Sequence, residues 1–587
     1  MWCSTRLSPP LRCGSARRSL HAPLLSATRI PARLFSTTVI RGQQESAKID
    51  PVTGLKASEE KDKPFYVTSP IFYVNAAPHV GHMYTMVLVD VVKRWEQLKG
   101  RKALLVTGTD EHGMKIQQAA QLAQKDPLEF CDTGAAMFQD LAARVNCKYD
   151  TFIRTTDPKH HDAVQYFWQM LQARDLIYSD KHSGWYSVAD ETFYPENSVE
   201  SVVDPATGQK IKVSKETGRE VQWTSEVNYH FRLSSMAPKL LEFYKQNPDW
   251  IVPHSRYKEV VAAVEEGLED LSISRTRSRL SWGIQVPNDP EQTVYVWLDA
   301  LVNYLTASGY PWTPGREQAL GWPADLHVIG KDIVKFHCIY WPAFLLALDL
   351  PMPKRILTHA HWTMNHKKMS KSDGNVVNPF YAIDRFGTDP MRYYMARDGG
   401  IKDDGDYSNE MILTRYRSEL QRGFGNITGR VRGKKFDVEA SVKAAMSGGM
   451  TGDWIFDTVD VSMVKALDKH PRDVYDRMEK LDIPGGLRGI VDLMDETNRY
   501  LQDTAPWSID KEKNPTELLR RIYFAAEAIR ICAILLQPFM PEKAKMILDN
   551  FSVDPAKRTM HHAAIAMDDA YGARIGKPPQ PFPPLPE

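Results

Sequence analysis

The stretch that most constrains the fold of this chain lies between residues 64 and 107. The apolar segment 64–68 has the composition of a short buried strand, and the turn His79-Val80-Gly81-His82 follows it. Apolar residues then recur at spacings of three and four over 80–98, which predicts an amphipathic helix that Gly100 ends. A second strand is expected over 103–107. Strand, helix and strand with polar residues at the strand ends predict a doubly wound, nucleotide-binding α/β sheet.

At 587 residues the chain is too long for one compact core, so two to four domains are expected. Strand-like segments return at 293–297, 326–329 and 355–358, after an aromatic-rich stretch that we interpret as an insertion packed over the sheet. From about 411 the apolar spacing is helical. The predicted parts are a linker over 45–62, α/β halves over 63–174 and 251–378, the insertion over 175–250, a connecting region over 379–410, a helical domain over 411–570 and a proline-rich, structureless tail over 571–587.

The first 44 residues differ from the rest of the chain. They carry seven arginines, many serines and threonines, and no acidic residue before Glu45. This composition is typical of a mitochondrial transit peptide, so we expect the protein in the mitochondrial matrix. A basic tail that binds nucleic acid is the alternative. Without residues 1–44 the chain holds 67 basic and 73 acidic residues, so any RNA binding must use local basic patches.

The turn from His79 to His82 suits phosphate binding. A helix N-terminus offers free N–H groups and the positive end of a dipole. Histidines three residues apart share a face there and can donate hydrogen bonds to phosphate oxygens, while Gly81 lets a planar base approach the backbone. Alone, the turn is weak evidence. A second segment, 367–375, follows a predicted strand and carries the lysines and serines that would grasp a polyphosphate.

His-Val-Gly-His, followed 289 residues later by Lys-Met-Ser-Lys-Ser, resembles the two signatures of class I aminoacyl-tRNA synthetases. Segments 66–75, 107–113, 295–304 and 329–337 sharpen the resemblance to the methionyl-tRNA synthetase family, of the mitochondrial or bacterial type. The resemblance implies a Rossmann-type parallel sheet with an inserted connective domain, followed by an all-α anticodon-binding domain. It also implies ATP-dependent activation of methionine and its transfer to tRNA(Met), with Mg²⁺ carried by the nucleotide.

The resemblance also implies roles for individual residues. Asp110 is expected to hold the ammonium of methionine. The catalytic residues are expected to be His79, His82, Lys368 and Lys371. Further ATP contacts are expected from Gly81, Gly330, Asp332, Met369, Ser370 and Ser372. The rest of the methionine pocket is expected to consist of Ile71, Tyr73, Trp297, Ala300, Tyr304, Ile333 and His337. Arg275 resembles a family arginine near ATP.

In the helical region the resemblance points to the anticodon. Asn426 and Arg430 lie four apart on one predicted helix face and could contact base edges, and Trp507 could stack on a base. The region 379–410 is expected to support the acceptor stem. A basic stripe able to hold the RNA backbone is predicted from Arg415, Arg417, Arg422, Arg430, Arg432, Lys434 and Lys435.

The sequence departs from the family in its insertion. Many relatives hold zinc there through CxxC pairs, whereas this chain has Ser187 and Asp190 at that spacing and no CxxC pair among its six cysteines. Because serine is a poor zinc ligand, we expect an insertion without a structural metal. No appended β-barrel is recognisable after about 570 and no apolar run approaches the roughly 18 residues that span a bilayer, so a monomer without membrane contact is expected.

Other functions remain open at this point. Leucyl, isoleucyl and valyl enzymes share both signatures but usually carry a large editing domain between them. A cysteinyl enzyme would need a zinc-binding cysteine in its amino-acid site. A nucleotidyltransferase with an HxGH turn would lack the lysine-rich loop and the helical domain. The non-enzyme alternative is a catalytically dead, synthetase-like RNA-binding protein, against which the presence of His79, His82, Asp110 and Lys371 argues.

Overall fold

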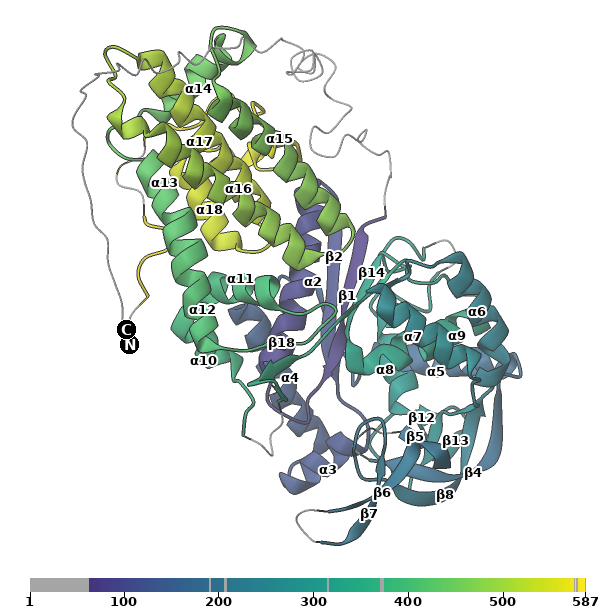
Figure 1. Ribbon diagram of the computed structural model, residues 1–587. Helices are drawn as coiled ribbons and strands as arrows, with labels where there is room; N and C mark the ends of the chain where they lie inside the picture. The colour runs from purple at the N-terminus through teal and green to yellow at the C-terminus, as the bar shows by residue number, and fades with distance from the viewer. Residues whose placement is uncertain are drawn as a thin grey trace, which may run out of the picture.

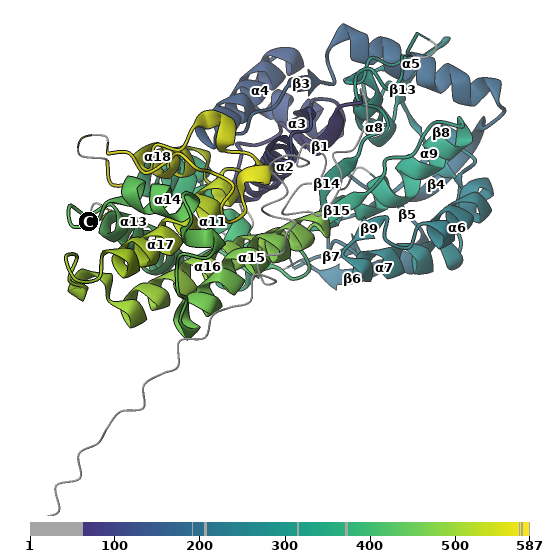
Figure 2. The ribbon, with the colours of Figure 1, turned by 90° about the horizontal axis from the view of Figure 1, so that it is seen from above.

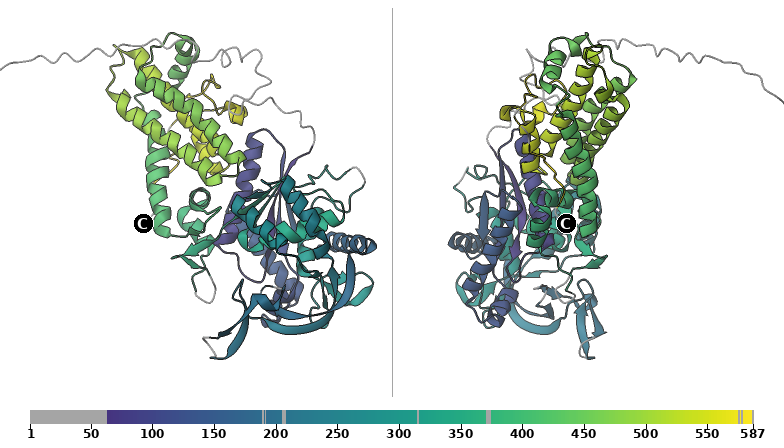
Figure 3. Two further views of the ribbon diagram at one scale, coloured as in Figure 1. Left: turned by 45° about the vertical axis from the view of Figure 1, so that its right-hand side comes forward. Right: turned by 90° about the vertical axis from the view of Figure 1, so that its left-hand side faces the viewer.

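The computed structural model describes residues 63–585 apart from 189, 191, 205–207, 314–315, 370–373, 575, 577 and 578. The expected transit peptide and linker, and the predicted site residues Ser370, Lys371 and Ser372, lie outside the described residues. An α/β part occupies the middle of the molecule, with an insertion at one end and a bundle of helices at the other (Figures 1 and 3).

The α/β part is built on a six-stranded parallel sheet with the order β3-β2-β1-β14-β15-β9. The chain order reverses between β1 and β14, which makes their carboxyl ends the switch point where ligands bind in open α/β sheets. The predicted doubly wound fold class is therefore confirmed. The strands are β1 (Phe65–Tyr73), β2 (Ala103–Asp110), β3 (Thr151–Arg154), β9 (Ile251–Val252), β14 (Leu326–Gly330) and β15 (Ile356–His359).

Helices cover both faces of this sheet (Figure 2). On one face α2 (Val80–Leu98) packs on Val67, Leu105 and Val328; on the other, Tyr66, Val106 and Ile329 join a second core. Alternate residues of one strand thus enter different cores, as the period of two in a strand requires. The second core includes α5 (Pro158–Ala173), α6 (Ala237–Gln246), α7 (His254–Glu265), α8 (Val296–Thr306) and α9 (Trp341–Ala347). Helices α3 (Met114–Leu122) and α4 (Pro127–Arg144) contribute to the first core.

The insertion is a separate antiparallel unit. Its long strands β4 (Ile177–Ser187) and β8 (Gln222–Phe231) pair along ten residues, and β6 (Val199–Val203) and β7 (Lys210–Ser214) form a hairpin. The prediction that 293–297 returns to the central sheet is wrong. That segment ends β13 (Asp289–Val294), which lies in a small antiparallel sheet, and then starts α8. The remaining strands are β5 (Thr192–Tyr194), β10 (Leu271–Ser272), β11 (Ser274–Thr276) and β12 (Gln285–Val286).

The chain after β15 leads from the cleft to the helical bundle. Strands β16 (Trp362–Met364), β17 (Lys367–Lys368) and β18 (Gly405–Asp406) form a small sheet beside α10 (Pro379–Phe386) and α11 (Thr388–Asp398). A nearly continuous helix follows, made of α12 (Asn409–Arg415), a π-helical segment (Tyr416–Gly425) and α13 (Asn426–Val431). The bundle itself consists of α14 (Val438–Met446), α15 (Thr458–Glu479), α16 (Ile483–Thr504), α17 (Pro515–Leu536) and α18 (Pro541–Asn550).

A buried arginine joins the bundle to the sheet. Arg392 on α11 is fully buried, and its Nη2 lies 2.6 Å from the Asp90 carboxylate on α2. The guanidinium also donates to the carbonyls of Pro538 and Phe539 in the bundle, at 2.8 and 3.0 Å, and to Val145 at 3.1 Å. A planar group with five donors can satisfy such a set of acceptors, so one side chain connects three parts of the fold.

The proline-rich tail is packed rather than structureless in its described part, so that prediction is wrong. The Phe582 side chain is fully buried against the long helix, and the Tyr416 hydroxyl donates to the Pro583 carbonyl at 2.5 Å. Asn550 holds the Pro579 carbonyl at 3.0 Å. Two buried aromatic residues, Tyr571 and Phe582, thus anchor the tail on the bundle.

Candidate active site

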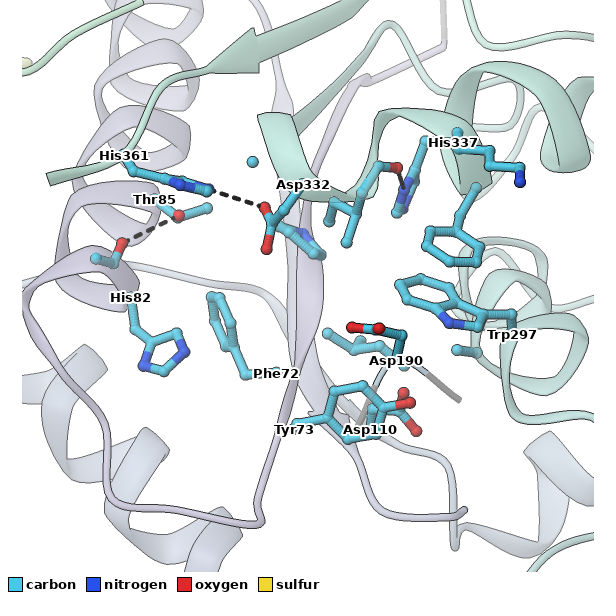
Figure 4. A pocket seen from close by; sticks show the side chains of 18 of the residues that line it. Phe72, Tyr73, His82, Thr85, Asp110, Asp190, Trp297, Asp332, His337 and His361 are labelled. Atoms are coloured by element: carbon cyan, nitrogen blue, oxygen red, sulfur yellow. Dashed lines mark hydrogen bonds and ion pairs between the residues drawn. The ribbon is translucent and has the colours of Figure 1, made fainter. Parts of the chain in front are cut away.

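A cleft of about 500 Å³ opens at the carboxyl ends of β1, β2, β14 and β15, at the switch point of the sheet (Figure 4). It gathers predicted site residues from distant parts of the chain. The predicted residues that line it are Ile71, Tyr73, His79, Gly81, His82, Asp110, Trp297, Ala300, Tyr304, Gly330, Asp332, Ile333, His337, Lys368 and Met369. The roles assigned to these residues stay predictions.

His79 and His82 cap α2 reciprocally. The Gly81 N–H donates to His79 Nδ1 at 3.1 Å, and the His79 N–H donates to His82 Nδ1 at 3.1 Å. Each Nδ1 is an acceptor and therefore carries no proton, so each neutral ring keeps its proton on Nε2. Burial, followed by the neighbouring His79, holds the pKa of His82 well below its ordinary value. The cap thus provides uncharged N–H donors at the positive end of a helix, beside the cleft.

Two glycines in the cleft leave room for side chains two residues away from them in the chain. A Cβ on Gly81 would lie 2.8 Å from His79 Cε1, and a Cβ on Gly330 would lie 2.6 Å from Asp332 Oδ1. Asp332 accepts a hydrogen bond from His361 Nε2 at 3.1 Å (Figure 4). The Asp332 side chain is 63% exposed, at the open side of the cleft. Enclosure by the cleft walls raises its pKa, but this bond and the attraction of His361 outweigh that effect and lower the pKa to about 2. Asp332 is therefore an anionic acceptor in the cleft.

The opposite wall of the cleft is aromatic. Trp297, at the start of α8, stacks on Phe336 with ring centroids 3.6 Å apart. The Tyr304 oxygen and His337 Nε2 are 2.7 Å apart, and His337 Nδ1 donates to the Ile333 carbonyl at 3.0 Å. His337 Nε2 therefore accepts the Tyr304 proton. Burial lowers the pKa of His337 to about 4, so this wall is uncharged at neutral pH. Such a slot fits an apolar side chain above Asp110, which ends β2.

The structure adds cleft residues that the sequence did not indicate. His359 ends β15 and His361 follows it, and Lys335 and Phe336 follow β14. Thr85 Oγ1 lies 2.9 Å from His359 Nε2. Their position at the ends of central strands or directly after them was a usable signal, because strand carboxyl ends meet at one edge of the sheet. Asp190 and Thr217 of the insertion also line the cleft, and no local pattern predicted that.

The donor set of the insertion does not fit a zinc site. Ser187 Oγ accepts the Asp190 N–H at 3.2 Å, and Asp190 Oδ2 accepts the hydroxyls of Thr217 at 2.7 Å and Tyr194 at 3.1 Å. Hydroxyls and one carboxylate occupy the two facing turns where zinc would need thiolates or imidazoles. Among the residues that the structure describes, no group of three His, Cys, Asp or Glu side chains could hold a metal ion.

Arg275 lies behind the cleft and does not line it. Its guanidinium carbon is 5.1, 5.0 and 4.7 Å from the ring centroids of Tyr186, Phe193 and Tyr295. The first two aromatic residues belong to the insertion and the third precedes α8. Arg275 therefore connects the insertion with the catalytic half through cation–π contacts.

At the far end of the molecule, Arg430 and Trp507 are in contact. The Arg430 guanidinium carbon lies 4.6 Å from the Trp507 ring centroid, and its Nη1 donates to Asn498 Oδ1 at 3.2 Å. The Trp507 side chain is 43% exposed, and Asn426 is exposed one turn before Arg430. The three predicted residues thus form one accessible polar and aromatic surface, to which Asn498 of α16 is added.

The predicted basic stripe is smaller than expected. Arg415 Nη2 pairs with Asp398 at 2.7 Å and its Nη1 pairs with Glu419 at 3.0 Å. Arg432 donates to the carbonyls of Gly572 and Ala573 in the tail. These two arginines therefore hold the long helix in place. The prediction included them because spacing along a helix does not reveal partners from other segments.

Comparison with known proteins agrees with this geometry. Residues 65–432 match the family described as class I tRNA synthetases (M), so the chain is a class I tRNA synthetase. Residues 453–582 match the anticodon-binding domain of methionyl tRNA ligase. The chain belongs to the methionyl-tRNA synthetase family.

Individual relatives cover nearly the whole chain. A probable mitochondrial methionine–tRNA ligase of Neurospora crassa is 51% identical over 96% of this chain and 92% of that protein. Its counterpart in Schizosaccharomyces pombe is 42% identical over 86% of this chain and 93% of that protein. The structure of Mycobacterium tuberculosis methionyl-tRNA synthetase with methionyl-adenylate is 37% identical with a TM-score of 0.80, and the match covers 89% of this chain and 100% of that one. Among the described helices, none is long and apolar enough to cross a membrane.

Proposed function

We propose that this protein is a methionine–tRNA ligase that activates methionine with ATP and transfers it to tRNA(Met). One observation carries the proposal: a single cleft at the switch point joins the histidine cap to an uncharged aromatic slot above Asp110. The cap suits a phosphate and the slot suits a thioether side chain. The relative from Mycobacterium tuberculosis supports this, since its printed description includes methionyl-adenylate.

In the first step the methionine carboxylate attacks the α-phosphorus of ATP, and pyrophosphate leaves. This step needs little proton transfer, so positioning and charge stabilisation supply the catalysis. His79 and His82 donate from Nε2 to the phosphates, and Asp332 accepts from the nucleotide ribose. Lys368 and Lys371, with Met369, Ser370 and Ser372, close over the leaving pyrophosphate. Mg²⁺ enters with ATP and is held mainly by its phosphate oxygens.

The amino acid lies between Asp110 and the aromatic wall. The Asp110 carboxylate holds the substrate ammonium, and Ile71, Tyr73 and Ala300 bound the slot. Sulfur contacts with Trp297 and Tyr304 contribute about 0.3–1.5 kcal/mol each. Because His337 accepts the Tyr304 proton, neither group brings a charge next to the thioether.

In the second step the tRNA 3′ end takes methionine from the adenylate. The surface of Asn426, Arg430 and Trp507 contacts the anticodon, with the indole as a stacking platform. Residues 379–410 support the acceptor stem between the two ends. The predicted domain boundaries belong to this proposal, together with a monomeric state and an insertion without zinc.

The mitochondrial relatives and the arginine-rich first 44 residues support a mitochondrial location, and we propose the matrix. Methionylation of tRNA(Met) by the chain without residues 1–44 tests the function. Lys371→Ala is expected to abolish adenylate formation and to keep tRNA binding, measured by pyrophosphate exchange and filter binding. Absence of methionylation in the unsubstituted chain would overturn the proposal.

A further inference from the structure

A fully buried carboxylate lies directly behind the amino-acid wall. Asp299 is on α8, next to Ala300 and two residues after Trp297, and its side chain is inaccessible to solvent. Its Oδ2 lies 2.7 Å from His112 Nδ1 and its Oδ1 lies 2.7 Å from His160 Nε2. None of these three residues lines the cleft. The catalytic steps described above do not use them.

The charge of Asp299 decides which atoms donate in its hydrogen bonds with His112 and His160. Burial raises the pKa of Asp299, but attraction to His112 and hydrogen bonds from both imidazoles outweigh burial and lower the pKa below its ordinary value. An ionised carboxylate can only accept hydrogen bonds, so His112 Nδ1 and His160 Nε2 are donors. His160 Nδ1 lies 2.9 Å from Thr306 Oγ1, farther along α8. Asp299 is thus satisfied on both oxygens, as a buried charge must be.

The segment that carries His112 is fixed at other points as well. Trp282 Nε1 donates to the Glu111 carbonyl at 2.6 Å. The Glu111 carboxylate accepts from Arg154 at 2.7 and 2.9 Å, and from the Thr109 hydroxyl at 2.6 Å. These bonds restrict the movement of the turn after β2 on the side away from α8. The Asp299–His112 bond joins this turn to α8.

This bond joins two parts of the cleft that come from chain positions 187 residues apart. His112 follows Asp110 by two residues, and Asp299 follows Trp297 by two. The sheet itself is joined to α8 by the Tyr66 hydroxyl of β1, which donates to the Tyr304 carbonyl at 3.0 Å. The Asp299–His112 bond is a second link, and it joins α8 to the residues that directly follow β2. The position of Asp110 is therefore coupled through this bond to the position of the aromatic slot.

We propose that Asp299 and His112 are positioning residues that set the length of the amino acid accepted, by fixing Asp110 relative to Trp297 and Ala300. The inference rests on the proposed function and deepens it. Asp299 acts on substrate only through its neighbours, since it is closed off from the cleft. Ethionine, which is one methylene longer than methionine, is the compound that tests this register.

The test measures amino-acid-dependent pyrophosphate exchange with methionine, ethionine and homocysteine, and with ATP varied separately. Asp299→Asn keeps the shape and removes the charge. We expect the KM for methionine to rise about tenfold, which corresponds to about 1.4 kcal/mol. The KM for ATP should stay within about twofold, and the preference for methionine over ethionine should fall. His112→Asn keeps a donor near Nδ1 and should retain the preference, whereas His112→Phe should lose it.

Asp325→Asn is the matched control. Asp325 is also buried and paired, with Lys63 at 2.5 Å and Lys354 at 2.9 Å, but it lies outside the cleft lining. It should lower the melting temperature without changing the preference among amino acids. Equal increases in both KM values for Asp299→Asn, or equal behaviour of the two His112 variants, would overturn the inference. If Asp299→Asn does not fold, the His112 pair decides alone. Failure of the proposed function would differ, because the unsubstituted chain would then show no exchange with methionine.

Discussion

The rings of His79 and His82 stack with centroids 3.8 Å apart, while the backbone N–H of the first donates to Nδ1 of the second. The pair is a helix cap and also lines the cleft. Because capping uses Nδ1 of each ring, the protons on Nε2 remain for a ligand. The folding requirement and the chemical requirement are thus met by different nitrogens of the same two rings.

Gly81→Ala is expected to impair activation without unfolding the protein. The new Cβ would lie 2.8 Å from His79 Cε1, so the imidazole must move out of its capping position. We expect kcat/KM for ATP in pyrophosphate exchange to fall about 10- to 100-fold, a loss of about 1.4–2.7 kcal/mol. Gly429→Ala, whose Cβ would meet nothing within 4 Å, is the control and should leave exchange unchanged. Equal effects of the two variants would contradict the proposed role of the cap.

Trp507→Ala is expected to weaken tRNA use and leave adenylate formation intact. Loss of a stacking platform removes about 1–3 kcal/mol per base, so the KM for tRNA should rise about 10- to 100-fold. Trp223→Ala serves as the control, since that indole is 57% exposed on the insertion. Steady-state aminoacylation and pyrophosphate exchange measure the two steps separately. A fall in exchange for Trp507→Ala would show that the residue acts on the fold instead.

Arg392→Met is expected to lower the free energy of unfolding strongly. It leaves the buried Asp90 carboxylate with Arg94, whose Nε lies 2.6 Å away, and with the Lys148 N–H at 2.8 Å, and it removes the donors to Pro538 and Phe539. Breaking a buried pair on one side typically costs about 3–5 kcal/mol. Arg472→Met removes an exposed pair with Asp468 and should change stability by less than about 1 kcal/mol. Urea unfolding of both variants measures the difference in the free energy of unfolding. Similarly small losses of stability in the two variants would refute the stabilising role of Arg392.

The stability of the protein is expected to fall as the pH decreases below about 6.5. Burial holds the pKa of His327 well below its ordinary value, and lowers the pKa of His337 and of His359 to about 4. At pH values between these lowered native pKa values and the unfolded pKa of about 6.5, the unfolded chain binds protons that the native protein does not. The native state is therefore favoured above this window and loses stability as the pH decreases through it. The contribution is up to about 1.4 kcal/mol per pH unit for each histidine.

His327→Gln isolates one of these groups. Urea unfolding between pH 5 and 7.5 should give a shallower pH dependence for His327→Gln than for the unsubstituted chain. Parallel curves would mean that the His327 pKa is not lowered by folding.

Much of the α/β part could be predicted because its signals are local. The helix over 80–98 and its flanking strands depend on apolar spacing and on one glycine, and the structure places them within a few residues of the prediction. The cleft residues followed from their positions at strand ends and from the resemblance. The histidine cap could be predicted as a phosphate site, but its reciprocal hydrogen bonds could not, since they depend on ring orientation.

What escaped prediction depends on contacts between distant segments. Strand β9 has only two residues and pairs with β15 about a hundred positions later, so no periodicity marks it. The segment 293–297 is apolar and β-branched like a core strand, yet tertiary packing makes its second half the start of α8. The partners of Arg415 and the burial of Phe582 likewise come from other parts of the fold.

Pyrophosphate exchange with a panel of amino acids tests the central proposal most directly. The chain without residues 1–44 would be assayed with methionine, leucine, isoleucine, valine and cysteine in parallel, under identical ATP and Mg²⁺. The uncharged slot of Trp297, Tyr304 and His337 above Asp110 predicts exchange with methionine far above the other four. Exchange with none of them would contradict the claim that the protein activates an amino acid. Faster exchange with any amino acid other than methionine would contradict the assignment of the slot to methionine.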